Sequence, residues 1–350
     1  MRILIANAQV PFARGGAEIL AESLRAELER RGHQAEIVAL PYTWRSREEL
    51  VAQAAAWRLL DLAEVGGERV DLLIATRFPS YLVRHPRKVV WLVHQLRQIY
   101  DLKGTRHSDF VDHGRDAQVI ETVRAMDRQG LGEARQVFTI SRHTAERLAR
   151  FNGLTGTPLH PPPATQPLLR PGPYGDYVFT AGRLNAMKRF DLLLRAVAAA
   201  RRPVRCRIAG SGPEREALAA LAVRLGIADR VELLGWVDER QLAELYSGAL
   251  GVYYAPFDED YGYVTVEAFL SAKPVLTAAD SGGVLEFAQD GVNACVAPAA
   301  DPAAIGRAID RLWDDRELAA RLGRAGRERV AGISWDAVVA ALLGDPAGGG

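Results

Sequence analysis

Short, nearly all-apolar segments alternate along the chain with segments of helical periodicity, and this alternation limits the possible folds more than any other feature. The first apolar segment (2–6) is followed by a helical stretch (17–31) that a glycine ends, and then by a second apolar segment (35–39). Later apolar segments of the same kind occupy 70–75, 88–93 and 136–140. Strands that are apolar on both sides, with helices between them, predict a parallel sheet covered on both faces.

A proline-rich stretch divides the chain into two such α/β halves. Residues 157–173 read TPLHPPPATQPLLRPGP, which cannot continue a helix or a central strand because proline has no backbone N–H. After it the alternation resumes, with strands expected at 177–181, 204–209, 231–234, 251–255, 274–278 and 295–297. We therefore expect a first domain at 1–160, a linker at 161–174, a second domain at 175–332 and a final helix at 333–346.

The balance of charges gives no reason to expect nucleic acid as a partner. The 350 residues include 44 Lys or Arg and 43 Asp or Glu. Surfaces that bind the phosphate backbone of nucleic acids usually have a clear excess of basic residues. No stretch approaches the roughly 20 apolar residues that span a bilayer, and the chain starts with a strand-like segment, so we expect a cytoplasmic protein. A helix near 44–62, with Trp44 and Trp57, leaves peripheral contact with the inner face of the membrane open, although amphipathic packing is the simpler explanation. Oligomeric state is also open.

Ligands of open α/β sheets bind in the loops that follow the carboxyl ends of the strands, and in the first half two such loops are unusual. Gly15 and Gly16 lie directly before a helix, where paired glycines let a ligand approach the backbone and free N–H groups attract anions. A plain tight turn would look the same. His94 follows the segment at 88–93 and is placed to contact a sugar or to transfer a proton, although a lone histidine is more often structural.

In the second half, Arg183 and Lys188 closely follow the strand expected at 177–181 and stand just before a helix. Two cations together with helix N–H groups can neutralise a diphosphate leaving group without a metal ion. The alternative is a solvated pair of charges. Lysine occurs only four times in this arginine-rich chain, and this scarcity favours a functional interpretation of Lys188.

Two glutamates eight residues apart occupy the loop and the helix that follow the strand expected at 251–255. Glu259 falls in the loop and Glu267 in the first turns of the helix, and carboxylates at this spacing can accept hydrogen bonds from the hydroxyls of a donor sugar and a ribose. Gly262 lies between them and would leave backbone N–H groups free for a phosphate. Alternatively, Glu267 simply occupies the favourable first turn of a helix.

Taken in order, these motifs resemble those of the family 4 retaining glycosyltransferases, which have the GT-B fold of two tandem Rossmann-like domains. The matching segments are GGAE at 15–18, GRLNAMKR at 182–189, GSGPE at 210–214, EDYGYVTVE at 259–267 and DSGG at 280–283. EDYGYVTVE fits the E-x7-E pattern of that family, and the final ISWDAVVAAL resembles its closing helix, which crosses back to the first domain. The resemblance is weakest over 41–130. It implies the α/β fold class, with two Rossmann-like domains facing each other across a cleft.

The resemblance also implies an enzyme that moves a sugar from a nucleotide-sugar, with UDP and GDP as the leading nucleotides, to an unidentified glycan, lipid-linked or small-molecule acceptor. The first domain would be the acceptor side, and the second would bind the donor. Arg183 and Lys188 would bind the diphosphate and Glu267 the ribose, while Glu259 and His94 would contact the donor sugar.

Backbone groups would complete the donor site, at Gly15 and Gly16 in the first domain and at Gly262 and Tyr263 in the second. No metal ion is expected at the donor site, because two cations are available there to neutralise the diphosphate. Retention at the anomeric carbon is implied by the family and not by any single residue. Two alternatives stay open: a GT-B nucleotide-sugar epimerase or phosphorylase, and a nucleotide-sugar-binding protein without turnover.

Overall fold

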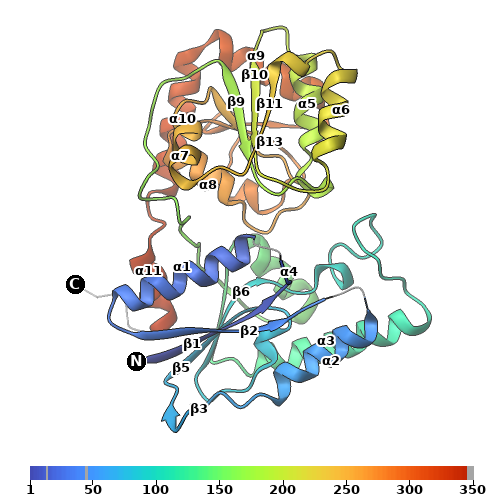
Figure 1. The fold of residues 1–350 in the computed structure, drawn as a ribbon, viewed down its shortest axis with the longest axis vertical. Helices are drawn as coiled ribbons and strands as arrows, with labels where there is room; N and C mark the ends of the chain where they lie inside the picture. Colours follow the sequence, from blue (N-terminus) through green and yellow to red (C-terminus); the bar gives the residue numbers. More distant parts are fainter. Residues whose placement is uncertain (13–14, 44–45, 345–350) are drawn as a thin grey trace. The chain divides into compact units, whose positions relative to one another are not determined.

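The protein is represented by a computed structural model that describes residues 1–12, 15–43 and 46–344. It divides into two compact units. Met1–Pro162 forms the first together with the C-terminal segment from Ser334, and Pro163–Ile333 forms the second (Figure 1). We call them unit 1 and unit 2 and describe each by itself.

Unit 1 is built on a six-stranded sheet in the order β2-β1-β5-β6-β7-β8, with every neighbouring pair parallel. Its strands are β1 (Arg2–Gln9), β2 (Gln34–Pro41), β5 (Leu72–Arg77), β6 (Lys88–His94), β7 (Gln136–Thr139) and β8 (Thr157–Pro158). The central strands β5 and β6 are buried along nearly their whole length, because the sequences LLIATR and KVVWLVH place apolar side chains on both faces of the sheet.

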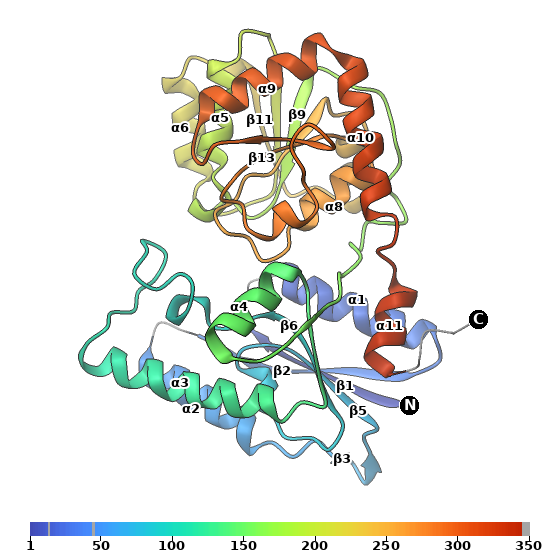
Figure 2. The ribbon, with the colours of Figure 1, turned by 180° about the vertical axis from the view of Figure 1, so that it is seen from behind.

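Helices cover the sheet of unit 1, and they are α1 (Gly16–Arg30), α2 (Arg47–Leu59), α3 (Gly114–Gly132), α4 (Arg142–Asn152) and α11 (Trp335–Leu343). α2 packs against α3, and α1 packs against α11 (Figure 2). Trp91 of β6 meets Trp335 of α11 edge to face, with ring centroids 6.2 Å apart, so the C-terminal helix is part of unit 1. Residues 345 and 346 of the helix expected at 333–346 lie outside the described residues.

Unit 2 has a second parallel sheet, in the order β11-β10-β9-β12-β13-β14. Its strands are β9 (Tyr177–Ala181), β10 (Arg205–Ala209), β11 (Val231–Gly235), β12 (Gly251–Tyr253), β13 (Val275–Ala278) and β14 (Ala294–Ala297). The chain adds strands on one side of β9 up to β11 and then returns to the other side with β12. The direction of strand addition therefore reverses between β9 and β12, and such a switch point is where open α/β sheets bind ligands.

The helices of unit 2 are α5 (Phe190–Ala199), α6 (Arg215–Arg224), α7 (Glu239–Ser247), α8 (Tyr263–Leu270), α9 (Pro302–Asp314) and α10 (Arg316–Val330). Figure 1 shows α5 and α6 on one side of the sheet and α7 and α8 on the other. Short 3-10 helices complete the elements: η1 (Ser80–Leu82) and η2 (Arg97–Ile99) in unit 1, and η3 (Ala186–Lys188), η4 (Ala228–Arg230) and η5 (Gly283–Glu286) in unit 2.

Parts of the proline-rich stretch are bound to the two units. Thr157–Pro158 forms β8, the edge strand next to β7, whereas the sequence predicted no strand there. Proline excludes only a central strand, because one side of an edge strand needs no hydrogen-bond donor. At the other end of the stretch, Lys273 Nζ donates to the carbonyls of Gly172 and Pro173, each at 2.8 Å. A two-stranded hairpin in unit 1, β3 (Glu64–Val65) with β4 (Glu68–Arg69), was also not predicted.

The helix expected near 44–62 is α2, and its side chains are used for packing inside unit 1. Trp57 is fully buried, and Arg47 pairs with Asp116 at 2.8 Å. Trp44 and Arg45 lie outside the described residues. Trp57 is therefore not available to contact a membrane, and it does not support membrane binding by this helix. In the ranges that the structure describes, none of the helices combines the length and the apolar character needed to cross a membrane.

Candidate active site

Three loops meet at the switch point of the unit 2 sheet, where main-chain hydrogen bonds join them. Phe257 N donates to Met187 O at 2.8 Å, which links the loop after β12 to the loop after β9. Glu259 N donates to Ser281 O at 3.3 Å, and Gly283 N donates to Glu259 O at 2.7 Å, which links the loop after β12 to the loop after β13. The segments that carry most of the predicted donor-site residues are thus held side by side.

Lys188 and Glu259 form an ion pair at this place. The Asn185 side chain accepts a hydrogen bond from Lys188 N at 3.2 Å and so caps the turn that carries the lysine. Lys188 Nζ donates to the hydroxyl of Tyr254 at 2.9 Å and pairs with the Glu259 carboxylate. The side chains of Lys188 and Glu259 are 20% and 22% exposed, so a ligand can still reach both. The structure brings together two predicted site residues and adds Tyr254, which the sequence did not single out.

The electrostatics keep Lys188 charged. Burial by itself lowers the pKa of the Lys188 ammonium, but the Glu259 carboxylate and the Tyr254 hydroxyl together raise it above its ordinary value. Lys188 is therefore a cation at every physiological pH. Arg183, on the same loop, is exposed and takes no part in the bonds between Lys188 and Glu259. It adds a second positive charge to the loop.

Arg189, which the sequence analysis did not propose, clamps the three loops together. Its Nη1 and Nη2 donate to the two carboxylate oxygens of Asp280 at 2.8 and 2.7 Å, and its Nε donates to Ala255 O at 2.7 Å. Arg189 is buried, and its φ of 51° lies in the left-handed region that side-chain-bearing residues rarely adopt. Arg189 is the last residue of the motif GRLNAMKR and Asp280 is the first residue of DSGG. Nothing in the sequence indicated that these two side chains face each other.

Close approach of the loops requires glycine at several positions, of which Gly212 and Gly283 are two. A Cβ atom on Gly212 would lie 2.4 Å from Leu184 O, and one on Gly283 would lie 2.4 Å from Asp260 O. Both distances are far shorter than any real contact of a Cβ atom, so no other residue fits there without a backbone shift. These glycines are explained by the packing of the loops.

Gly262 and Tyr263 form the beginning of α8. Gly262 has a φ of 88°, and a Cβ atom there would lie 3.0 Å from the Tyr254 ring, so this turn requires glycine. Tyr263 is the first residue of the helix, and its ring meets the ring of Tyr261 edge to face at 5.2 Å. The turn places the first N–H groups of α8 directly after the loop that carries Glu259.

Glu267, one turn into α8, is buried and hydrogen-bonded. Its Oε2 accepts a hydrogen bond from the Tyr246 hydroxyl and its Oε1 accepts one from Thr165 Oγ1, both at 2.7 Å. Burial raises the pKa of the Glu267 carboxyl, and the two hydroxyl groups oppose that shift. The sequence predicted the place of Glu267 in the helix. It could not predict the two partners, because they are 21 and 102 residues away along the chain.

In unit 1, the GGAE segment opens α1. Gly15 N donates to Glu18 Oε2 at 2.9 Å, and Glu18 is paired with Arg77 at the end of β5. Gly15 has an extended backbone that any residue can adopt, and among the described residues a Cβ atom there would meet only the Glu18 carboxylate, at 3.5 Å. The fold of unit 1 does not itself require glycine at this position.

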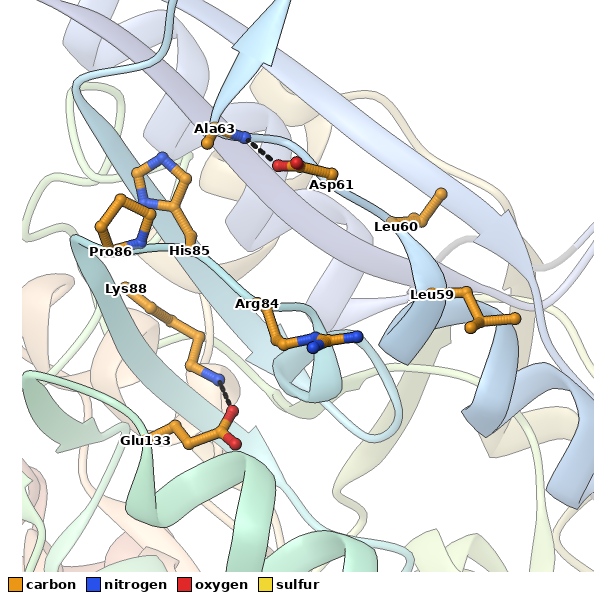
Figure 3. Close-up of a pocket in the computed structure, with 9 residues that line it drawn as sticks. All are labelled: Leu59, Leu60, Asp61, Ala63, Arg84, His85, Pro86, Lys88 and Glu133. Carbon is orange, nitrogen blue, oxygen red and sulfur yellow. Dashed lines mark hydrogen bonds and ion pairs between the residues drawn. The ribbon is translucent and has the colours of Figure 1, made fainter.

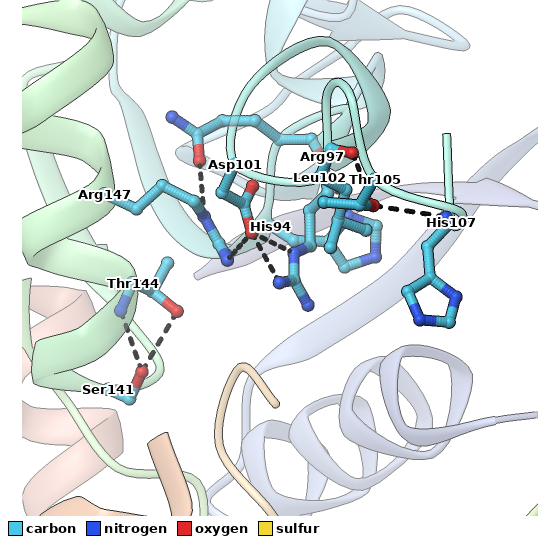
Figure 4. Close-up of polar contacts among 10 residues, drawn as sticks. His94, Arg97, Asp101, Leu102, Thr105, His107, Ser141, Thr144 and Arg147 are labelled. Atoms are coloured by element: carbon cyan, nitrogen blue, oxygen red, sulfur yellow. Dashed lines mark hydrogen bonds and ion pairs between the residues drawn. The ribbon is translucent and has the colours of Figure 1, made fainter. Parts of the chain in front are cut away.

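His94 ends β6 and lies beside a charged cluster. Its Nδ1 is 2.8 Å from Gln95 O. Arg97 Nε and Arg147 Nη1 both donate to Asp101, at 2.8 and 3.3 Å (Figure 4). The side chains of the three charged residues are largely buried. The sequence did not reveal this cluster, because Arg147 follows Asp101 by 46 residues and is brought back by the fold.

A cavity of about 520 Å³ lies elsewhere in unit 1 (Figure 3). Its lining includes Leu59, Arg84, Glu133 and Lys88, the first residue of β6. His94 is the last residue of the same strand. The cavity is therefore at the amino end of the sheet, and the predicted site residues are at the carboxyl end.

Two units, each built on a parallel sheet covered by helices, have the architecture of the GT-B fold. Solved structures share this fold along nearly the whole chain. A sucrose-phosphate synthase from Thermosynechococcus elongatus has a TM-score of 0.78 and 22% identity, with 98% of each chain covered. HepE of Anabaena, solved in complex with UDP and glucose, has a TM-score of 0.73 and 17% identity, with 99% of this chain and 100% of that chain covered. The predicted fold class is confirmed.

Sequence comparisons identify the family. The model of the family described as glycosyl transferases group 1 matches residues 173–329. A D-inositol 3-phosphate glycosyltransferase of Streptomyces scabiei is 30% identical over 340 residues, which cover 86% of this chain and 74% of that protein. A protein of the same name from Streptomyces avermitilis is 36% identical over 173 residues, or 46% of this chain and 37% of that protein. The chain belongs to the glycosyl transferases group 1 family, and the predicted glycosyltransferase class is confirmed.

Proposed function

We propose that the protein transfers a sugar from a UDP- or GDP-sugar to a hydroxyl group of its acceptor, with retention at the anomeric carbon and without a divalent metal ion. One observation carries this proposal. Lys188 pairs with the Glu259 carboxylate at the switch point of the unit 2 sheet, and this carboxylate helps to raise the pKa of the Lys188 ammonium. The ammonium suits a diphosphate and the carboxylate suits sugar hydroxyls, so the pair matches the two parts of a nucleotide-sugar on either side of the bond that breaks.

Departure of the nucleoside diphosphate builds negative charge on its β-phosphate. Lys188 and Arg183 would meet that charge, and their contribution grows as the bond breaks. The bond between the anomeric carbon and the phosphate oxygen breaks while the acceptor oxygen forms a bond on the same face. The proton of the acceptor hydroxyl passes to the leaving phosphate. Backbone N–H groups at Gly262 and Tyr263 would add to the neutralisation, because they open α8.

The other predicted residues receive roles according to their positions. Glu267, buried within unit 2 at the second turn of α8, would bind the ribose hydroxyls. Glu259 would hold the donor sugar next to the phosphate that Lys188 binds, and His94 would contact the same sugar from unit 1. Gly15, where the fold of unit 1 does not require glycine, would let the backbone approach the phosphates.

For the acceptor, the names of the relatives suggest a phosphorylated polyol, and D-inositol 3-phosphate is the first compound to test. A glycan or a lipid-linked acceptor is the alternative. We assign the reaction to the cytoplasm, where nucleotide-sugars are made. Peripheral contact with the membrane is not part of this proposal, because Trp57 of α2 is inside the core of unit 1.

Thermal melts followed by a turnover assay test the proposal. A ligand that binds only the folded state raises the melting temperature, so UDP- and GDP-sugars are screened first. The donor that stabilises the protein is then incubated with D-inositol 3-phosphate, with and without excess EDTA. We expect sugar transfer at equal rates in both samples and an α-linked product from an α-linked donor. Activity that EDTA abolishes and only Mg²⁺ or Mn²⁺ restores would refute the metal-free mechanism.

The same assay separates the alternative functions. Conversion of the donor to an isomeric nucleotide-sugar would identify an epimerase, and formation of a sugar phosphate with inorganic phosphate would identify a phosphorylase. Binding of the donor without turnover in the presence of glycan, lipid-linked and small-molecule acceptors would identify a binding protein. The variant Lys188→Ala serves as the control that shows whether an observed turnover uses this site.

A further inference from the structure

Two hydroxyl groups from separate parts of unit 2 hold the Glu267 carboxylate. Thr165 Oγ1 donates to Oε1 and the Tyr246 hydroxyl donates to Oε2, both at 2.7 Å. Thr165, Tyr246 and Glu267 are 5%, 0% and 8% exposed, so water does not compete for these bonds. Each carboxylate oxygen therefore has one fixed donor.

The two donors are themselves fixed by the fold. Tyr246 lies on α7, and its ring packs edge to face against Phe179 of β9, with centroids 4.9 Å apart. Thr165 lies in the turn where the chain enters unit 2, and the next residue, Gln166, donates to the carbonyl of Ile333 at 3.1 Å. Ile333 is the last residue of unit 2. The turn of Thr165 is thus tied to the point where the chain leaves the unit.

This arrangement determines which hydrogen bonds Glu267 can still accept. A carboxylate has about four acceptor positions, and the two hydroxyls use one on each oxygen. One acceptor position remains on each oxygen of the carboxylate. The two hydroxyls of a vicinal diol can donate to these two positions in parallel hydrogen bonds. Without the fixed donors, the carboxylate would rotate about its last bond and would present this pair only part of the time.

We propose that Thr165 and Tyr246 are positioning residues that orient Glu267 toward the 2′- and 3′-hydroxyls of the donor's ribose, and so set a preference for ribonucleotides over 2′-deoxyribonucleotides. The inference rests on the proposed function, in which Glu267 binds the ribose. Neither hydroxyl needs to touch the nucleotide. Removing one of them leaves the carboxylate in place but less well oriented, so the loss falls on the ribose contact and not on the base or the phosphates.

Calorimetry with paired nucleotides tests this inference. UDP is compared with 2′-deoxy-UDP, and GDP with 2′-deoxy-GDP, for the wild type and each variant. Thr165→Val and Tyr246→Phe each remove one hydroxyl at nearly constant volume. Each is expected to reduce the preference for the ribonucleotide by about 3- to 10-fold, the effect of one hydrogen bond, with little change for the deoxynucleotide. Thr165→Ser keeps the hydroxyl and should keep the preference.

A buried hydroxyl without a partner supplies the matched control. Thr180 of β9 is fully buried, and its Oγ1 has no hydrogen-bond partner among the described residues. Thr180→Val makes the same chemical change as Thr165→Val in the same unit. It should leave the ratio of the two dissociation constants as in the wild type.

The variants distinguish failure of this inference from failure of the proposed function. If Glu267→Gln loses the preference while Thr165→Val and Tyr246→Phe keep it, the positioning role is wrong and the ribose role of Glu267 stands. If Glu267→Gln keeps the preference, the ribose role itself is wrong. Equal losses for both nucleotides in the hydroxyl variants also overturn the inference, because they indicate a general distortion of the site. Should Thr165→Val fail to fold, Tyr246→Phe and Thr165→Ser decide the question.

Discussion

Each unit has a lysine whose ammonium group is hydrogen-bonded within the protein, but the partners differ between Lys88 in the interior of unit 1 and Lys188 at the carboxyl ends of the strands in unit 2. Lys88 Nζ donates to the carbonyls of Tyr81, Val83 and Gly130 at 3.0, 2.9 and 2.8 Å, so each of its three N–H bonds has a backbone acceptor. Among the described residues, Lys188 Nζ bonds to side chains, those of Tyr254 and Glu259.

A buried carboxylate with two hydroxyl donors also occurs in both units. Asp127 of α3 is fully buried, and its two oxygens accept hydrogen bonds from Tyr81 and Tyr100, each at 2.8 Å. Burial raises the pKa of the Asp127 carboxyl to about 7. Glu267 has the same kind of partners and a pKa raised for the same reason. Neither burial nor the direction of the pKa shift separates the two.

The location of a group is what distinguishes a functional group here. Lys88 is bonded in the interior of unit 1 to three backbone carbonyls, with Glu133 at 3.6 Å, and Asp127 is bonded to two buried tyrosines, so these bonds complete a structure. Lys188 and Glu267 follow the carboxyl ends of β9 and β12, where the sheet leaves room for ligands. The Lys188–Glu259 pair is partly exposed, so a ligand can exchange with it, and the two hydroxyls that hold Glu267 leave acceptor positions on its oxygens that a ligand can use. Substitutions at five residues, taken from the largest expected effect to the smallest, test whether this distinction holds.

Replacing Lys188 is expected to have the largest effect. Lys188→Ala should lower kcat by about 10²- to 10³-fold, because it removes a preorganised donor at a developing negative charge. Its melting temperature should change little, since the side chain is partly exposed and bonds to no backbone group. Lys188→Arg should recover only part of the activity, because a guanidinium differs in shape and reach. Steady-state turnover and a thermal melt are measured for each variant.

Lys88→Met is the matched control in unit 1. It leaves three buried carbonyls without their donor, which should lower the free energy of unfolding by about 1–3 kcal/mol or more. The kcat of the molecules that remain folded should be that of the wild type. Near-normal kcat in Lys188→Ala, or a large loss of kcat in Lys88→Met, would remove the distinction between the two lysines.

The two carboxylates should respond in opposite ways to loss of charge. Asp127→Asn should lower the free energy of unfolding by about 1–3 kcal/mol, because one tyrosine hydroxyl then faces a donor instead of an acceptor. Its affinity for UDP or GDP should be unchanged. Glu267→Gln should weaken nucleotide binding even when no sugar is present. Chemical denaturation and calorimetry on both variants measure these effects, and a loss of nucleotide affinity in Asp127→Asn would show that the Asp127 site is not purely structural.

The stability of unit 1 should depend on pH through Asp127. The pKa of this carboxyl is about 7 in the folded protein, against an ordinary value of 3.8. The folded state therefore holds the proton more tightly, and this stabilisation is complete below about pH 4 and is lost as the pH rises toward 7. Asp127→Asn lacks this dependence. The difference in melting temperature between wild type and variant should thus be larger at pH 5 than at pH 7.5, and a constant difference would contradict the shifted pKa.

Most of the fold could be predicted from the sequence, because apolar strands in a parallel sheet are recognisable without knowledge of the contacts. The strand expected at 177–181 is β9, and the strand expected at 136–140 is β7. The two-residue strands β3, β4 and β8 were missed. Segments this short have no period that could be detected, and their pairing depends on neighbours that the fold supplies.

The site could be predicted only from the rule that open α/β sheets bind ligands at the carboxyl ends of their strands. That rule selected Lys188 and Glu259, which the fold brings together, but it could not show that Arg189 would bond to Asp280. Such pairs join loops from different strands, and no local spacing encodes them. The scarcity of lysine was a poor guide, because Lys273 is also buried and donates only to backbone carbonyls.

The smallest expected effect is that of Glu259→Gln on the affinity for the free nucleotide. The ion pair with Lys188 determines whether this affinity rises or falls. The Lys188 ammonium pairs with Glu259, so a diphosphate that binds Lys188 must compete with this carboxylate. A neutral amide competes less and does not repel the phosphates, so free UDP or GDP should bind about 2- to 5-fold more tightly, as expected for one partly exposed ion pair. The gain should shrink as salt is added, because mobile ions screen the same repulsion.

The intact nucleotide-sugar should respond differently to Glu259→Gln. If Glu259 holds the donor sugar, the variant should lose turnover although it binds the free nucleotide better. Calorimetry with free nucleotide at low and high salt, beside steady-state turnover with the donor, measures both effects. Weaker binding of the free nucleotide would mean that Glu259 orients Lys188 toward the diphosphate rather than competing with it. The Lys188–Glu259 pair would then be a fixed structural interaction, like the bonds of Lys88 in unit 1, although it is partly exposed.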